Sequence, residues 1–98
     1  MSVQIVHFST TPDRVVEVEK GIADLMSALG HAKPSGIEYS ASRLGELPEF
    51  LLTLTLRDGA DNPLLRLAAA TEFRGKIADW AGAPVAPVVL RPLGRYAG

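Results

Sequence analysis

Two consecutive segments with an alternating pattern constrain the fold of this chain most. Residues 49–57, EFLLTLTLR, place phenylalanine or leucine at every second position, with threonine at most positions between them. Residues 36–44, GIEYSASRL, also alternate, and the short link LGELP leads from one segment to the other. A period of two is typical of a strand with one buried face, and a short link favours an antiparallel hairpin. The sequence therefore predicts a β-hairpin in the middle of the chain.

An amphipathic helix is predicted before this hairpin. Between Val15 and Leu29, apolar residues recur at steps of three and four, while charged residues fall on the opposite side. This spacing is typical of a helix that buries one face. A threonine cap followed by Pro12 begins the helix, and we expect Gly30 to end it in a left-handed conformation.

The helical region after the hairpin is less regular. A turn over residues 58–63 leads to Asn62 as the N-cap and Pro63 as the first helical residue. The apolar residues that follow lie on two different faces, which one straight helix cannot bury together. We therefore expect two short helices, with a break near Ala70 and with Thr71 as the cap of the second.

Strands are also predicted near both ends of the chain, at residues 3–10 and 85–97. Pro87 and Pro92 cannot donate to a ladder, which places the last strand at an edge or in a crossover to a partner. The resulting order is β-α-β-β-α-β. It predicts one α+β domain over residues 1–98, a ferredoxin-like fold with a four-stranded antiparallel sheet and both helices on one face.

The second face of this sheet is predicted to be partly apolar. Leu51 and either Tyr39 or Ala41 are expected to lie on it. A substantially apolar face favours a cover, and the simplest cover is a second copy of the chain, packed sheet against sheet in a two-fold homodimer. The alternative is a monomer with a moderately apolar surface.

Composition and charge exclude several classes of site and partner. The chain has no cysteine, and its two histidines, His7 and His31, are far apart, so we predict neither a disulfide framework nor a zinc site of the Cys/His kind. Its net charge is −1 and its basic residues are scattered, which argues against nucleic-acid binding. Neither a membrane span, a secretory leader nor a glycine-rich phosphate loop is recognised. We therefore expect a cytoplasmic protein without membrane contact.

Residues 68–84, AAATEFRGKIADWAGAP, contain the main candidate site residues. Arg74 lies at the flank of an apolar stripe formed by Phe73, Ile77 and Trp80. An arginine in that position can donate two hydrogen bonds to an oxyanion, or it is simply a solvated residue at the helix margin. Phe73 and Trp80 are either core residues or the walls of a pocket for an aromatic ligand.

Two residues of the predicted strands are further candidates. His7 has the same parity as Val3 and Ile5, and a histidine in a cleft can act as a general base near neutral pH. The alternative is a packed or interface histidine. Tyr39 can donate a phenolic hydrogen bond to a ligand, or pack with its hydroxyl at the rim of the fold.

With these features, the chain resembles the antibiotic-biosynthesis monooxygenase superfamily of dimeric α+β barrels. The resemblance covers nearly the whole chain and rests on the element order, the split second helix and the proline-marked final strand. TEFRGKIADWAGAPVAPVVLRPLGRYA, residues 71–97, is similar to a segment of the quinone-forming polyketide monooxygenases. The resemblance implies a dimeric α/β barrel that oxidises a phenolic or anthrone-type substrate with O2, without flavin, metal or haem. The substrate carbanion then reduces oxygen directly.

The resemblance also suggests roles for individual residues. It implies that Arg74 stabilises an oxyanion, and it places Asn62 near a tyrosine of the family. Leu52 and Leu56 stand where the family has asparagine and tryptophan, and the histidine of haem-degrading members is absent. Two functions therefore stay open, a cofactor-independent monooxygenase and a non-catalytic dimeric module that binds a small ligand. The expected site residues are Arg74 and His7 as catalytic residues, and Tyr39, Phe73, Trp80 and Asn62 as substrate-binding residues.

Overall fold

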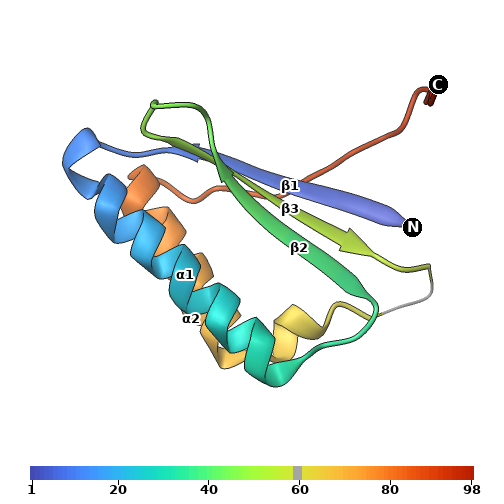
Figure 1. Ribbon diagram of the computed structural model, residues 1–98. Coiled ribbons are helices and arrows are strands. Elements are labelled where there is room, and N and C mark those ends of the chain that lie inside the picture. The colour runs from blue at the N-terminus through green and yellow to red at the C-terminus, as the bar shows by residue number, and fades with distance from the viewer. Residues whose placement is uncertain (59–60) are drawn as a thin grey trace.

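Four strands form one antiparallel sheet, and two helices cover one of its faces (Figure 1). The computed structural model describes residues 1–58 and 61–98. The strand order β2-β3-β1-β4 is compatible with a ferredoxin-like fold, and the α+β class is confirmed. The elements, in chain order, are β1 (Ser2–Ser9), the 3-10 turn η1 (Pro12–Arg14), α1 (Val15–Ala32), β2 (Ile37–Arg43), β3 (Glu49–Leu56), the 3-10 turn η2 (Pro63–Arg66), α2 (Ala68–Ala81) and β4 (Val88–Val89).

The pairing register of the strands determines which side chains face the helices. Phe50, Leu52 and Leu54 of β3 are buried, as the alternating pattern predicts. In β1, Val6 lies opposite Leu52 and Phe8 opposite Phe50. Because directly opposite residues share a face, these side chains form one apolar inner face against the helices.

Tyr39 and Ala41 also belong to this inner face, and their predicted position on the outer face is wrong. Tyr39 pairs with Leu54 and Ala41 pairs with Leu52, and both residues of β2 are half-buried. Leu51 does lie on the outer face, as predicted. Alternation alone fixes only which residues of a strand share a face. Which face becomes the inner one depends on the register, and the hairpin loop sets that register.

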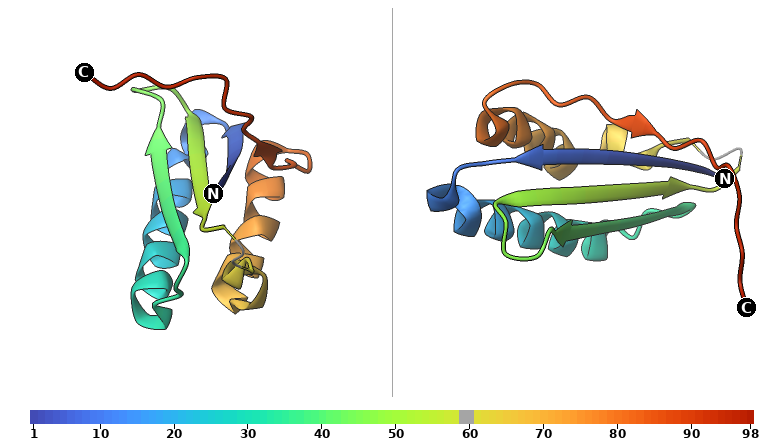
Figure 2. Two further views of the ribbon diagram at one scale, coloured as in Figure 1. Left: turned by 90° about the vertical axis from the view of Figure 1, so that its right-hand side faces the viewer. Right: turned by 90° about the horizontal axis from the view of Figure 1, so that it is seen from above.

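The helices supply the remaining core side chains. Val18 and Leu25 of α1 are buried, as are Phe73, Ile77 and Trp80 of α2. The three residues of α2 are spaced by four and three positions, so they project from one side of the helix. Both helices therefore bury their apolar stripes against the same face of the sheet (Figure 2).

The end of α1 differs from the prediction. Gly30 lies inside the helix, which continues to Ala32. Lys33, with a φ of 48°, takes the left-handed position that was expected for Gly30. A glycine within a helix is costly but tolerated, whereas Pro34 cannot continue the helix, and the helix therefore ends just before it.

The start of the second helical region is partly as predicted. The Asn62 side-chain oxygen accepts a hydrogen bond of 3.0 Å from the Leu64 N–H, which confirms Asn62 as the N-cap of η2. The break falls at Leu67, whose backbone is extended, so Thr71 lies within α2 and does not cap it. The predicted turn over residues 58–63 includes residues 59–60, which lie outside the described residues.

The C-terminal segment contains less strand than the predicted range 85–97. β4 comprises only Val88–Val89, at the edge of the sheet beside β1, so the edge position is confirmed. Pro87 and Pro92 bracket this short strand, and neither has an N–H to extend the ladder. The exposed residues 91–98 then lead away from the rest of the chain (Figures 1 and 2).

Candidate functional site

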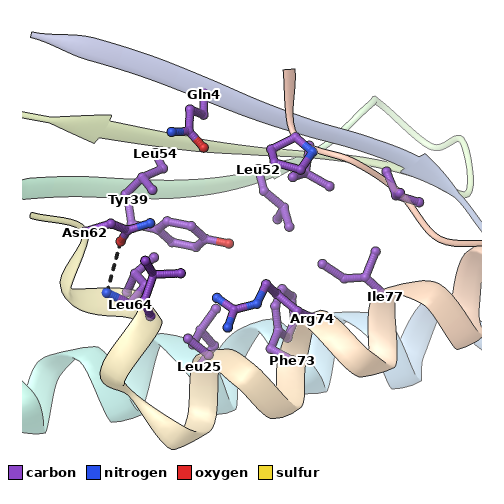
Figure 3. Close-up of a pocket in the computed structure, with 15 residues that line it drawn as sticks. Gln4, Leu25, Tyr39, Leu52, Leu54, Asn62, Leu64, Phe73, Arg74 and Ile77 are labelled. Atoms are coloured by element: carbon purple, nitrogen blue, oxygen red, sulfur yellow. Dashed lines mark hydrogen bonds between the residues drawn. The ribbon is translucent and has the colours of Figure 1, made fainter. Parts of the chain in front are cut away.

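A pocket lies between the inner face of the sheet and α2 (Figure 3). Its volume is about 240 Å3. Leu52 and Leu54 of β3, Leu64 of η2, and Phe73 and Ile77 of α2 form much of its apolar wall. A cleft between sheet and helices is therefore present, and Leu52 lines this space without filling it.

Four polar side chains reach the pocket from four segments (Figure 3). Gln4 comes from β1, Tyr39 from β2, Asn62 from the residue before η2, and Arg74 from α2. Among the lining residues, all of which the structure describes, the single hydrogen bond that involves a side chain joins Asn62 to the N–H of Leu64. The Gln4 amide, the Tyr39 hydroxyl and the Arg74 guanidinium therefore keep hydrogen-bonding capacity for a ligand.

Arg74 is the charged residue among those that line the pocket. Its Nη2 donates a hydrogen bond of 3.2 Å to Oγ1 of Thr71, one turn earlier in α2. Within residues 1–58 and 61–98, Arg74 forms no ion pair. A guanidinium is always charged at physiological pH, so the pocket carries one positive charge that no lining carboxylate compensates.

The Tyr39 hydroxyl is a hydrogen-bond donor at neutral pH. Burial raises the pKa of Tyr39 to about 12, and the nearby positive charge of Arg74 opposes this rise. A phenol with this pKa stays protonated at physiological pH. Tyr39 can therefore donate to an oxygen of a ligand beside Arg74, but it cannot serve there as a general base.

The raised pKa of Tyr39 leads to a testable pH dependence. We expect the ultraviolet absorbance of its phenolate to appear with a midpoint near pH 12, after subtraction of a Tyr39→Phe titration in which Tyr96 remains. The unfolded-state pKa is about 10, so the contribution of Tyr39 to stability is complete below that pH and is lost as the pH rises towards 12. A midpoint near 10 would contradict the burial of this hydroxyl.

The structure does not bring His7 to the pocket. His7 lies on the outer face of the sheet, next to Phe8, which points into the core. Its Nε2 lies 3.2 Å from Oε1 of Glu49 on the neighbouring strand, and the histidine is exposed. In a strand, adjacent side chains point to opposite faces. His7 therefore cannot act as a base on a ligand held between the sheet and α2 of the same chain.

Trp80 belongs to the core and is not among the residues that line the pocket. It is 5% exposed, and its ring centroid lies 6.4 Å from that of Phe8 and 5.8 Å from that of Phe73. Its indole N–H donates to the Glu17 carboxylate, and its backbone carbonyl accepts a hydrogen bond from the Thr10 hydroxyl. Phe73 is equally buried, so both residues belong to the core, and of the two only Phe73 also lines the pocket.

Gln4 is a pocket residue that the sequence interpretation missed. The even-numbered residues Val6 and Phe8 of β1 face the helices, and Gln4 has the same parity. Gln4 is thus a polar residue on a strand face that is otherwise apolar, and this contrast was a signal in the sequence for a pocket residue. It became interpretable only with the strand pairing, which places Gln4 opposite Leu54.

A second depression, of about 330 Å3, lies between the two helices. Its charged residues largely compensate one another, because Arg14 donates to the Asp79 carboxylate at 2.9 Å and to the Glu17 carboxylate at 3.1 Å. This depression lacks the apolar walls that most small-molecule sites have. We therefore regard the pocket beside Arg74 as the candidate site. The charged residues of the second depression are Arg14, Lys20, Lys76, Glu17, Asp24 and Asp79.

The described part of the chain shows neither a metal site nor a membrane span. In residues 1–58 and 61–98, no three histidine or acidic side chains gather closely enough to share a metal ion. No helix there is long and apolar enough to cross a membrane.

Comparison with known proteins does not identify the chain. No family model, curated protein or solved structure matches it. The pocket and its residues are therefore the features that bear on function.

Proposed function

We propose that this protein binds a small aromatic molecule with a negatively charged oxygen, in the pocket beside Arg74. The observation that carries the proposal is the single uncompensated charge at a largely apolar pocket. Apolar walls bind the ring, because burial of apolar surface contributes about 25 cal/mol per Å2. Arg74 and Tyr39 then donate hydrogen bonds to the anionic oxygen, and bonds to a charged acceptor are the stronger kind.

The proposal is tested by comparing an anion with a neutral ligand of the same shape. We expect 2-naphthoate to bind roughly tenfold more tightly than 2-naphthamide, since only the first offers a charged acceptor to Arg74. Protein-observed NMR titration measures both dissociation constants, even when binding is weak. Equal affinity for the two compounds would contradict a role for the charge, and absence of binding by both would contradict the proposed site.

A second candidate function is cofactor-independent oxidation of such a ligand. The observation that favours it is the pair of donors, Arg74 and Tyr39, which suits a developing enolate. The resemblance to quinone-forming monooxygenases points to the same chemistry. The described lining residues include no histidine or carboxylate, so the substrate must lose its proton to water. The carbanion then reduces O2, one oxygen atom enters the substrate as a carbonyl and the other leaves as water.

Oxygen uptake distinguishes this enzyme from a binding module. The substrates are anthrone and 1-naphthol, and the protein is freed of metal and flavin. An enzyme forms the quinone faster than the spontaneous reaction does, and its Arg74→Ala variant forms it more slowly. The Lys76→Ala variant is the control, because Lys76 is exposed on the same helix and does not line the pocket. If 2-naphthoate binds but neither compound is oxidised faster than in buffer, the binding module is supported.

We further propose that the chain forms the sheet-to-sheet homodimer of a dimeric α/β barrel. The support is the outer face of the sheet, where Val3, Ile5 and Leu51 remain partly exposed. Leu93 and Tyr96 of the C-terminal segment are each 92% exposed, so this segment offers further apolar surface to a second copy. Exposed apolar groups in one region favour association.

The dimer proposal leads to a prediction for Ile5→Asp. This change places a carboxylate at the apolar part of the outer face, where its desolvation opposes association. We expect the native chain to sediment as a dimer and Ile5→Asp to sediment as a monomer at the same concentration. Val16→Asp is the control, because Val16 is 78% exposed and lies on α1, away from the sheet. A monomeric native chain at high concentration would contradict the proposal.

A further inference from the structure

Gln4 and Tyr39 lie on the same cross-strand row of the inner face, on either side of Leu54. Leu54 pairs with Gln4 in one direction and with Tyr39 in the other. Neighbouring strands are about 4.8 Å apart, so the two backbones are separated by roughly 10 Å. Both side chains reach the pocket, with Arg74 entering from α2 (Figure 3). The pocket thus has polar groups on two sides of an apolar centre.

The Gln4 amide has no hydrogen-bond partner among the other residues that line the pocket. Gln4 is half-buried, and an amide that loses water without gaining a partner costs free energy. An amide can both donate and accept, so its natural partner is a hydroxyl or a carbonyl of a ligand. Because Gln4 is uncharged, it lacks the electrostatic attraction that Arg74 offers to the anionic oxygen.

The volume of the pocket restricts the size of the ligand. An engineered apolar cavity of about 150 Å3 holds one benzene molecule. The pocket here, of about 240 Å3, is larger by a factor of about 1.6, which corresponds to two fused rings rather than one or three.

We propose that the ligand of this pocket is a two-ring aromatic anion with a hydroxyl or carbonyl group at the end opposite its anionic oxygen, and that Gln4 binds this second group. The inference rests on the proposed function and specifies its ligand class. Gln4 thereby determines specificity, while Arg74 holds the anion. Leu54 and the other apolar wall residues enclose the rings between these two contacts.

A pair of ligands that differ in one hydroxyl tests the inference. We expect 6-hydroxy-2-naphthoate to bind about five- to tenfold more tightly than 2-naphthoate, which is the effect of one additional hydrogen bond. In Gln4→Leu this ratio falls to about one, because leucine offers no hydrogen bond to the added hydroxyl. Thr53→Val, an isosteric change on the outer face of the sheet, keeps the ratio. NMR titration gives all dissociation constants, and the spectra verify that each variant is folded.

The possible results separate this inference from the proposed function. If both naphthoates bind with equal affinity, or if Gln4→Leu keeps the ratio, the role of Gln4 is overturned while the proposed function stands. If anthracene-2-carboxylate binds more tightly than 2-naphthoate, the two-ring limit is overturned. If neither naphthoate binds, the proposed function fails, and the inference fails with it.

Discussion

Replacement of Trp80 by alanine is expected to lower the free energy of unfolding by about 3–5 kcal/mol, the usual range for a buried aromatic residue. Trp80 is 5% exposed, and it contacts aromatic rings from both the sheet and its own helix, Phe8 and Phe73. It also packs directly on α1, since a Cβ at Gly21 would lie only 2.6 Å from its ring. The truncation therefore removes the side chain that joins α1, α2 and the sheet, and leaves a cavity among them.

Urea denaturation followed by far-ultraviolet circular dichroism measures this change at a fixed protein concentration. Fluorescence is unsuitable, because Trp80 is the single tryptophan of the chain. The control is Val16→Ala, since Val16 is 78% exposed and its truncation is expected to change stability by less than about 0.5 kcal/mol. A loss of less than about 1.5 kcal/mol for Trp80→Ala would show that Trp80 does not have this role in the core.

Replacement of Arg74 by alanine is expected to weaken the binding of 2-naphthoate roughly 10- to 30-fold. Hydrogen bonds to a charged group contribute about 1.5–3 kcal/mol, whereas exposed ion pairs contribute at most about 1 kcal/mol. Arg74 is exposed in the free protein, so the lower part of the first range applies. The affinity for neutral 2-naphthamide is expected to change much less, because it lacks the charge that Arg74 recognises.

Two further variants show whether this effect belongs to the guanidinium. Arg74→Lys keeps the charge but loses the planar pair of donors, so its affinity is expected to lie between those of the native chain and Arg74→Ala. Lys76→Ala removes a positive charge from the same helix outside the pocket and is expected to leave the affinity unchanged within about twofold. An equal loss for Lys76→Ala and Arg74→Ala would indicate general attraction by surface charge instead of a contact in the pocket.

The main elements of the fold could be predicted because they depend on local patterns. The alternation in residues 49–57 predicts β3, and the apolar spacing after Val15 predicts α1. Asn62 and Pro63 mark the start of η2 by cap chemistry that acts over only two residues. Each of these signals lies within one segment, so these elements can be predicted without knowledge of how the strands pair.

The errors concern features that depend on contacts between segments. The face occupied by Tyr39 depends on the hairpin register, which the alternating pattern does not contain. The length of β4 depends on how many residues of the C-terminal segment pair with β1. Pro87 and Pro92 limit that number, because neither has an N–H for the ladder. Gly30 resembles a helix end, but α1 continues to Ala32, and Lys33, just before Pro34, takes the left-handed position.

The site could be predicted in part for the same reason. Phe73 and Arg74 are neighbours on one helix turn, so the position of Arg74 at the margin of the apolar stripe that includes Phe73 was visible in the sequence. His7 and Gln4 show the limit, because they lie on opposite faces of β1 and the sequence alone did not show which face borders the pocket. Trp80 has the spacing of a wall residue, but its position among other rings keeps it in the core.

Above all, we propose that an aromatic anion binds between the inner face of the sheet and α2. Intermolecular nuclear Overhauser effects test it most directly, because β3 carries leucines on both faces. We predict contacts between the ring protons of bound 2-naphthoate and the methyl groups of Leu52 and Leu54, which line the pocket. Contacts to Leu51 and Ile5 instead, on the outer face, would contradict the account.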